Sequence, residues 1–200
     1  MIQLPSFAGF ARLFVLLAWG AFALVFSLRR KPAPGAAVRR APAAIAGIAL
    51  QGAGFFAVWM LQADAFPALA PPHLVVQVLS VLAALLAAAS DWLVIEAVRA
   101  LGKQWSIQAR LIEGHRLVVA GPYGYVRHPI YTGMLGLLIS TGLAFSVWWA
   151  VLLAVPVFGA GTAIRVRAEE RLLLGAFGDD FEAYRRHVPA VLPRWSIPRA

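Results

Sequence analysis

The sequence predicts an all-α integral membrane protein with about five transmembrane helices, the last two of which form a helical hairpin. Hydrophobic residues make up 61% of the 200 residues and charged residues only 14%, whereas soluble folds contain roughly 45–50% apolar residues. Long apolar runs recur along the chain. The net charge of +9 is not arranged as a basic stripe with interleaved aromatic residues, so we expect no nucleic-acid partner.

The individual spans follow from segment length. A spanning helix needs about 20 mostly apolar residues, and residues 7–28, 43–61 and 73–98 each provide such a segment. Residues 129–164 form a run of 36 without any Lys, Arg, Asp or Glu. As one helix this run would be about 54 Å long, nearly twice a hydrocarbon core of about 30 Å. We therefore divide it into two short spans, with a turn near residues 143–147.

The basic residues predict the orientation of these spans. Residues 29–40, 99–128 and 165–200 hold 17 of the 18 Lys and Arg, and all three segments lie on one side of a five-span protein. Because an excess of Lys and Arg marks the cytoplasmic side, we expect the N-terminus outside and the C-terminus in the cytoplasm. The absence of cysteine, the many Ala and Arg and the short chain suggest a bacterial inner membrane.

Two ionisable residues lie inside the predicted spans. Arg12 is near the outer end of the first span, where we expect its long side chain to extend to the membrane interface. Asp91 lies one to two turns inside the third span, which makes it a functional candidate. The alternative for Asp91 is an ion pair with Arg99 or Lys103.

The polar residues of the second half form two blocks, residues 101–133 and 163–195, which flank the hairpin and should therefore meet in space. In the first block, Gly121 and Gly124 permit turns, and Pro129 suits the first turn of a helix. His128 then lies at about the N-cap, where free N–H groups attract anions. The alternative is that His128 is only a cap and Arg127 only part of a basic loop.

In the second block, Arg165 and Glu169 are i, i+4 neighbours on one helix face. The alternative is a solvated surface with one ion pair. Beyond them, Gly175 and Gly178 are expected to stop the helix. The four histidines show no ligand spacing for zinc or di-iron, so we expect no metal site. The chain also lacks a phosphate-binding glycine loop and a serine nucleophile motif.

Two paired motifs, GHRLVVAGPYGYVRHPIYTG (residues 114–133) and EERLLLGAFGDDFEAYRRHVP (residues 169–189), resemble the isoprenylcysteine carboxyl methyltransferase family and its phospholipid N-methyltransferase relatives. These are membrane enzymes that use S-adenosylmethionine without a Rossmann fold. The resemblance covers roughly residues 100–195. It implies that residues 101–200 form a catalytic region with the hairpin and a cytoplasmic, helical cofactor pocket, while residues 1–100 form a scaffold of three transmembrane helices.

The resemblance also implies roles for individual residues. Arg165 is the expected substrate-binding and catalytic residue, suited to an acceptor carboxylate or phosphate. The expected contacts with S-adenosylmethionine fall on Gln108, His115, Arg116, Leu117, Val118, Tyr123, His128, Pro129, Ile130, Tyr131 and Glu169. Of these, Arg116 and Ile130 are expected to contribute mainly their backbones.

The resemblance implies methyl transfer to a lipophilic acceptor, with a carboxylate of an isoprenylcysteine-like or isoprenoid substrate as the first expectation. N-methylation of phosphatidylethanolamine is the main alternative, and a thiol acceptor also stays open. A reductase related to the sterol reductases is disfavoured, because those chains are about twice as long. A non-catalytic membrane scaffold would leave the clustered His, Tyr, Arg and Glu without a purpose.

Overall fold

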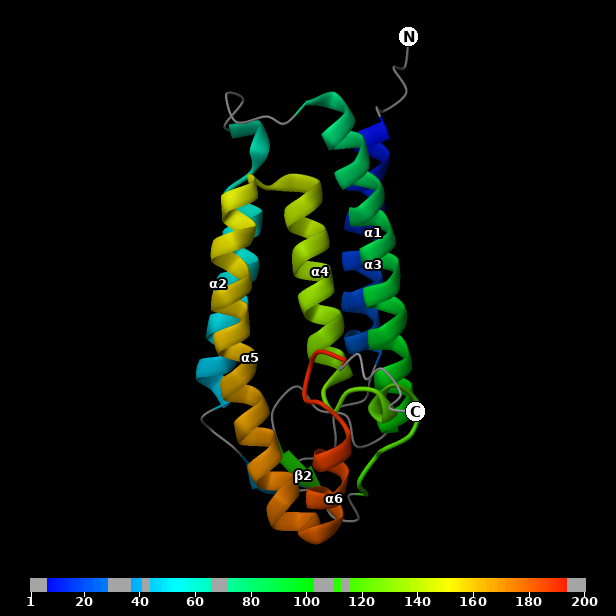
Figure 1. Cartoon of the computed structure of the whole chain (residues 1–200), viewed down its shortest axis with the longest axis vertical. Helices are drawn as coiled ribbons and strands as arrows, with labels where there is room; N and C mark the ends of the chain where they lie inside the picture. The colour runs from blue at the N-terminus through cyan, green and yellow to red at the C-terminus, as the bar shows by residue number, and fades with distance from the viewer. Residues whose placement is uncertain are drawn as a thin grey trace, which may run out of the picture.

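The computed structural model describes residues 7–28, 37–40, 44–65, 72–102, 110–112 and 116–193. These residues form an elongated bundle of five apolar helices, to which a short sixth helix is added (Figure 1). The five are α1 (Phe7–Ser27), α2 (Ala44–Met60), α3 (His73–Leu101), α4 (Pro129–Phe145) and α5 (Trp148–Phe177). The predicted all-α membrane protein, with a hairpin as its last two apolar helices, is confirmed.

The helices differ in length. By length and composition, α1, α3 and α5 can each cross a membrane. Helices α2 and α4 have 17 residues each, which is about 26 Å and slightly less than a hydrocarbon core of about 30 Å. The turn between α4 and α5 consists of Ser146 and Val147, at the end of the region in which it was predicted.

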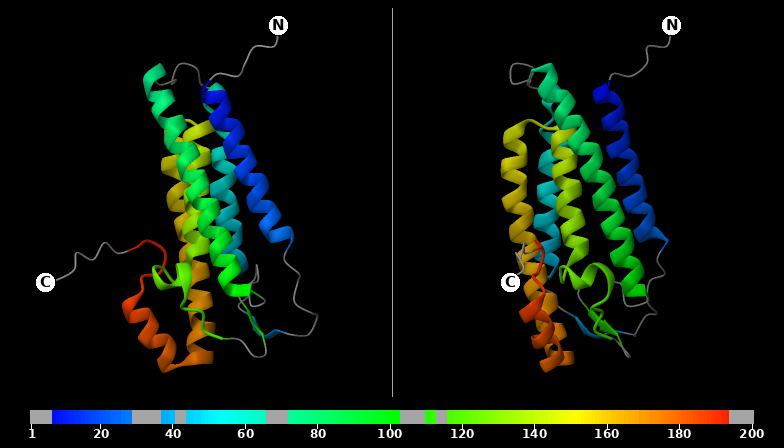
Figure 2. Two further views of the ribbon diagram at one scale, coloured as in Figure 1. Left: turned by 90° about the vertical axis from the view of Figure 1, so that its right-hand side faces the viewer. Right: turned by 45° about the vertical axis from the view of Figure 1, so that its right-hand side comes forward.

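The bundle is built from two close helix pairs. Helix α5 packs mainly against α2, and α4 packs mainly against α3, which α1 covers on its other side (Figures 1 and 2). The pairs are joined by the buried side chain of Leu138 of α4, which packs with Val58 of α2 and Phe158 of α5. On the other side of α4, Leu137 packs in a cluster with Val15 of α1. Helix α4 therefore lies at the centre of the core.

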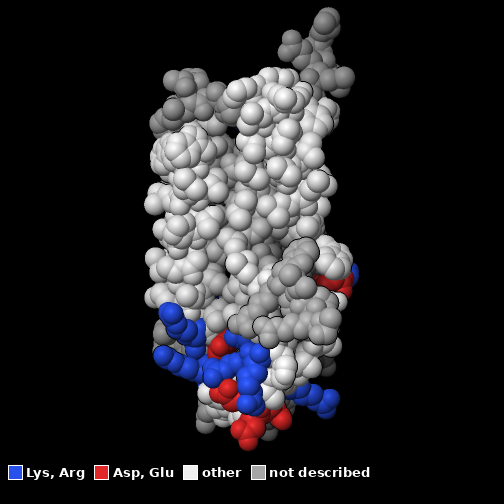
Figure 3. Space-filling view, in the orientation of Figure 1, with Lys and Arg blue, Asp and Glu red and all other residues white. Residues whose placement is uncertain are grey.

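The connecting segments alternate between the two ends of the bundle, as predicted. Strand β1 (Ala37–Arg40), which follows α1, pairs antiparallel with β2 (Arg110–Ile112), which follows α3. We call the end that holds these strands the polar end, because charged side chains gather there on the face seen in Figure 3. At the opposite end, the Val147 N–H donates to the Leu61 carbonyl, near the short helix η1 (Ala63–Ala65).

Glycines with positive φ direct the chain at the polar end. Gly121 (φ +62°) begins the short helix η4 (Gly121–Gly124), and Gly178 (φ +50°) separates α5 from α6 (Asp179–His187), which folds back along α5 (Figure 2). Gly124 lies at the end of η4, in keeping with the predicted turn. The prediction that Gly175 stops the helix was wrong. Gly175 lies inside α5, because a helix tolerates a glycine where the neighbouring residues continue its hydrogen bonds.

The two ionisable residues of the spans have different surroundings. Arg12 donates to both carboxylate oxygens of Asp64, at 3.0 and 3.1 Å, and to the Ala144 carbonyl. Its side chain therefore joins α1 to η1 and to the last turn of α4. Its extension to the membrane interface stays a prediction. Asp91 is not paired with Arg99, which instead binds Glu96.

One carboxylate oxygen of Asp91 is buried without a hydrogen-bond partner among the described residues. The other predicted partner of Asp91, Lys103, lies outside the described residues.

The contact between α2 and α5 depends on glycine. A Cβ atom added to Gly161 would lie 2.6 Å from the Gly47 carbonyl oxygen and 2.9 Å from the Gln51 nitrogen. Both are backbone atoms, so the helices would have to move apart. We expect Gly161→Ala to destabilise the protein by about 1–3 kcal/mol, which lowers the midpoint of thermal unfolding in detergent by roughly 2–10 °C.

The control for this substitution is Gly159→Ala in the same helix, because a Cβ atom there meets nothing within 4 Å. This variant should unfold at the wild-type temperature or slightly above it. Equal midpoints for the two variants would contradict the proposed close packing.

Candidate functional site

The imidazole of His128 lies between two consecutive glutamates of α5. His128 is the N-cap residue of α4, as predicted, but its side chain makes no capping hydrogen bond. Instead, Nε2 lies 3.2 Å from Glu170 Oε1, and Nδ1 lies 3.4 Å from Glu169 Oε2. The hypothesis that His128 serves only as a cap is therefore wrong. Its ring therefore connects the beginning of α4 to α5, the second helix of the hairpin.

The two glutamates determine the protonation of this histidine. Burial by itself would lower the pKa of His128, since it penalises the charged ring. The hydrogen bonds and negative charges of Glu169 and Glu170 outweigh burial and raise the pKa above the ordinary 6.5. The ring is thereby favoured as an imidazolium that donates from both nitrogens.

Arg127 connects the same cluster to the segment that follows α6. Its guanidinium binds Glu170, with Nε and Nη2 each 2.8 Å from Oε1. Nη1 donates to the carbonyls of Arg185 and Val188. The backbone N–H groups of Arg127 and His128 donate to the carbonyls of residues 189 and 190, at 2.8 and 2.9 Å. Arg127 is thus a structural ion-pair residue as well as part of a basic loop.

Tyr131 and Arg165 complete the cluster. The Tyr131 hydroxyl donates to Glu169 Oε1, and its ring stacks on that of His128 at 5.7 Å between centroids. The Arg165 guanidinium lies over the Tyr131 ring, 4.8 Å from its centroid, and forms the predicted i, i+4 ion pair with Glu169 at 3.7 Å. Arg165 is only 7% exposed, so the alternative of a solvated surface is wrong for this residue.

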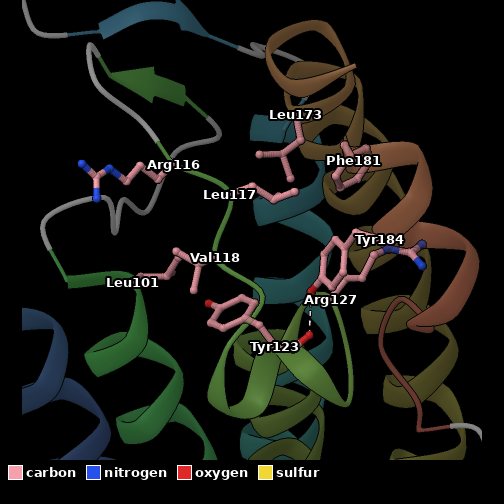
Figure 4. A pocket seen from close by; sticks show the side chains of 9 residues that line it. All are labelled: Leu101, Arg116, Leu117, Val118, Tyr123, Arg127, Leu173, Phe181 and Tyr184. Atoms are coloured by element: carbon pink, nitrogen blue, oxygen red, sulfur yellow. Dashed lines mark hydrogen bonds between the residues drawn. The ribbon is translucent and has the colours of Figure 1, made fainter. Parts of the chain in front are cut away.

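A small, mainly apolar pocket lies beside the cluster (Figure 4). Leu117 and Val118 come from the segment before η4, Leu173 from α5, and Phe181 and Tyr184 from α6. Leu101, Arg116, Tyr123 and Arg127 complete the lining. Arg127 therefore borders both the pocket and the cluster, which makes them neighbouring parts of one site.

The two tyrosines of the pocket are neutral hydrogen-bond donors. The Tyr184 hydroxyl donates to the Tyr123 carbonyl at 2.7 Å, drawn as a dashed line in Figure 4. Burial raises the pKa of Tyr184 to about 12. Burial also raises the pKa of Tyr123, and the charge of Glu169 raises it further.

The structure brings most of the predicted site residues together at the polar end. His128, Tyr131, Arg165 and Glu169 form the charged cluster, as the preceding distances show. Arg116, Leu117, Val118 and Tyr123 line the pocket. Pro129 is buried at the start of α4. The side chain of Ile130 packs against Val94 and Val98 of α3, in keeping with a backbone role, and Gln108 and His115 lie outside the described residues.

Sequence reasoning missed several residues of this site. Glu170 and Arg127 were visible as charges, but their pairing across 43 residues has no local signal. Leu173, Phe181 and Tyr184 form one apolar surface only because Gly178 turns α6 back along α5. Gln51 was treated as part of the scaffold, yet its Oε1 accepts from Arg165 Nη1 at 3.0 Å. The sequence did hold one signal for this contact, because Gln51 is a single polar residue within an apolar helix.

The chemistry of the site suits a ligand with both charged and flat apolar parts. The charged cluster offers a cationic imidazole, a guanidinium and carboxylate acceptors. The pocket offers aliphatic and aromatic walls with phenol donors. Both lie at the polar end of an apolar bundle.

Comparison with known proteins yields curated relatives over the second half of the chain. The Protein-S-isoprenylcysteine O-methyltransferase of Schizosaccharomyces pombe is 37% identical over 79 residues, which are 40% of this chain and 34% of that protein. The human protein of the same name is 30% identical over 95 residues, covering 44% of this chain and 31% of the relative. The Cobalt-zinc-cadmium resistance protein CzcN of Cupriavidus metallidurans is 35% identical over 103 residues, covering 50% and 46%.

The matched segments span between about a third and just under half of these relatives' own lengths. The model of the family described as phospholipid methyltransferase matches residues 78–180, just over half of the chain. This range includes most of α3, all of α4 and α5, and every residue of the charged cluster, whereas Gln51 lies outside it. The chain therefore belongs to the phospholipid methyltransferase family.

Proposed function

We propose that the protein is an S-adenosylmethionine-dependent membrane methyltransferase that acts on a lipophilic, anionic acceptor, with a carboxylate of an isoprenylcysteine-like or isoprenoid compound as the first candidate. The observation behind this proposal is the buried position of Arg165. This residue is a buried cation beside His128, Tyr131 and Glu169, at the border between the apolar bundle and its polar end. Such a cation suits an anionic group on an otherwise apolar molecule.

The residues of the site fit S-adenosylmethionine. Glu169 can accept hydrogen bonds from ribose hydroxyls or from the amino group of the cofactor, and the positive charge of a protonated His128 ring can attract its carboxylate. The pocket between Leu117, Leu173 and Tyr184 offers apolar walls for the adenine ring. The family relation supports this assignment, and no metal is required for the reaction.

When bound, S-adenosylmethionine supplies an electrophilic methyl group, which passes to the nucleophile while the sulfur–carbon bond breaks and the sulfonium becomes a neutral thioether. A carboxylate nucleophile becomes a neutral ester and releases no proton. Arg165 would hold the acceptor's anionic group through its planar guanidinium. Holding reactants in line can lower a barrier by roughly 7–11 kcal/mol, so positioning is the main task of these residues.

The apolar helices around Arg165 add a second contribution. Phe158 is buried at 1% exposure and Thr162 at 5%, on the α5 turns that precede Arg165. These turns keep water from the reacting groups. Because opposite charges disappear during transfer to a carboxylate, a site that solvates charge poorly favours reaction. With the polar end in the cytoplasm, as the basic residues predict, the cofactor would enter from water and the acceptor from the bilayer.

N-methylation of phosphatidylethanolamine is a second candidate, favoured by the family model that the chain matches. In this case Arg165 would bind the lipid phosphate. The two candidates give different products. When membranes that contain the protein are incubated with methyl-labelled cofactor, a carboxylate acceptor yields a base-labile ester and an amine acceptor yields a base-stable product. We expect the label in a base-labile lipid, and exclusively base-stable label would replace the first candidate by the second.

Cofactor binding tests the roles of Glu169 and His128. Each contributes a charged hydrogen-bonding group to the site, and the loss of one such bond costs about 1.5–3 kcal/mol. We therefore expect Glu169→Ala and His128→Ala each to weaken S-adenosylmethionine binding at least about tenfold, as measured by calorimetry in detergent.

The matched control is Glu182→Ala, which removes a carboxylate from α6 that pairs with Arg185 and should leave cofactor binding unchanged. Wild-type affinity in both site variants would refute the cofactor assignment. If calorimetry detects heat of binding on titration with NADPH but not with S-adenosylmethionine, the protein would instead be identified as a reductase.

Arg165→Ala should impair use of the acceptor more than binding of the cofactor. Removing the cation leaves the acceptor's anionic group without its charged hydrogen bonds, so kcat/KM for N-acetyl-S-farnesylcysteine should fall at least about hundredfold. The dissociation constant of S-adenosylmethionine should change much less. Arg167→Ala is the control, because Arg167 is exposed on the same helix. Equal kinetic losses in the two variants would argue against Arg165 as the acceptor-binding residue.

A further inference from the structure

A buried polar network joins the first half of the chain to Arg165. Gln51 of α2 is 2% exposed and lies among apolar residues of that helix. Its side-chain oxygen accepts from Arg165 Nη1 at 3.0 Å, and its side-chain nitrogen donates to Thr162 Oγ1 at 2.9 Å. All three side chains are buried. Polar groups at such depth are costly unless they are hydrogen-bonded to one another.

The two hydrogen bonds fix the direction of the Gln51 amide. Arg165 has only donors and therefore requires the amide oxygen, while the Thr162 hydroxyl oxygen can accept from the amide nitrogen. An amide turned by 180° would place its N–H₂ group against the guanidinium. Thr162 consequently holds the oxygen of Gln51 toward Arg165.

Backbone packing confines Arg165 further. A Cβ atom at Gly47 would lie 2.5 Å from Arg165 Cγ, so the stem of the arginine passes directly over this glycine. The Tyr131 ring contacts the guanidinium on another side. The stem thus lies on α2, while the charged head is held between the Gln51 amide and the Tyr131 ring.

Gln51 supplies this hydrogen bond without supplying a charge. Glu169 does carry a negative charge, but its ion pair with Arg165 is long, at 3.7 Å, and the same oxygen accepts from Tyr131. By contrast, Arg127 and Glu170 pair at 2.8 Å. A neutral amide in direct contact orients the guanidinium without adding a negative charge beside it.

We propose that Gln51, held in place by Thr162, is a positioning residue that aims Arg165 at the acceptor and makes the site selective for an acceptor with an anionic group. The inference rests on the proposed function and deepens it, since it names the residues that position Arg165 for the anionic acceptor. It also gives α2, outside the residues that the family model matches, a part in the reaction.

A carboxylate at this position tests the idea directly. Gln51→Glu changes the size of the side chain very little and keeps an oxygen acceptor, but adds a negative charge beside Arg165. The added charge should repel an anionic acceptor. We expect KM for N-acetyl-S-farnesylcysteine to rise roughly ten- to a hundredfold, while the dissociation constant of S-adenosylmethionine stays within about twofold.

A neutral competitor separates charge selection from a merely structural role. In the wild type, the carboxylate of N-acetyl-S-farnesylcysteine should bind more tightly than the corresponding carboxamide, and Gln51→Glu should abolish or invert this preference. Gln51→Leu, which removes the hydrogen bonds but adds no charge, should lower kcat/KM about tenfold and keep part of the preference. Thr162→Val should give a smaller loss of the same kind.

The control is Gln62→Glu, the same chemical change near the opposite end of the bundle, where Gln62 donates to the Trp59 carbonyl. It should leave both the acceptor KM and the carboxylate preference at wild-type values. Thermal unfolding of every variant in detergent shows whether a kinetic loss merely reflects loss of fold.

Two outcomes would overturn the inference while the methyltransferase assignment stands. The first is an unchanged carboxylate preference in folded Gln51→Glu, which means an equal loss for carboxylate and carboxamide. The second is a wild type that binds S-adenosylmethionine but shows no carboxylate preference. A wild type that binds no S-adenosylmethionine would instead refute the proposed function itself. Cofactor binding and acceptor preference therefore report separately on the two proposals.

Discussion

Two adjacent carboxylates of α5, Glu169 and Glu170, tie the beginning of α4 to the helix that follows it in the chain. This connection consists of ion pairs with His128 and Arg127. At the other end of the same hairpin, the turn consists of only two residues. The hairpin is thus closed at both ends, by a short turn and by ion pairs. Tyr131 and Arg165 meet because of this closure, and α6 docks where Arg127 donates to the carbonyls of Arg185 and Val188.

The position of the charged cluster follows from the cost of burying charge. An isolated ion in an apolar interior is penalised by several kcal/mol, and a partner recovers this only if the geometry and the remaining hydrogen bonds are good. Here each charge has more than one partner: Glu170 binds both Arg127 and His128, and Glu169 binds Tyr131 and Arg165. Because each charge is paired, the free-energy cost of burying this network at the polar end of the bundle is reduced. The network also fixes one arrangement of the site.

The first half of the chain contributes more than support. Gly47 and Gly161 permit the close approach of α2 to α5, and this approach is what allows Gln51 to reach the buried guanidinium. The same two glycines therefore govern both the stability of the bundle and the geometry of Arg165. A division into a scaffold and a catalytic region describes where the motifs lie, but the packing makes α2 part of the environment in which the acceptor would bind.

The sequence by itself determined the number of apolar helices and the bounds of most of them, because membrane thickness sets span length and charged residues mark the ends. The exception is α5, which continues past the predicted end at residue 164 to Phe177. It also determined that two polar blocks must meet, since a hairpin brings its ends together, and the motif resemblance marked His128, Arg165 and Glu169. Only the tertiary structure decided that Arg127 pairs with Glu170 and that Gln51 contacts Arg165 across 114 residues. Side-chain pairs between separate helices depend on rotation, depth and interhelical distance, and those are fixed by packing contacts such as Gly47 with Gly161, which leave no periodic signal along the chain.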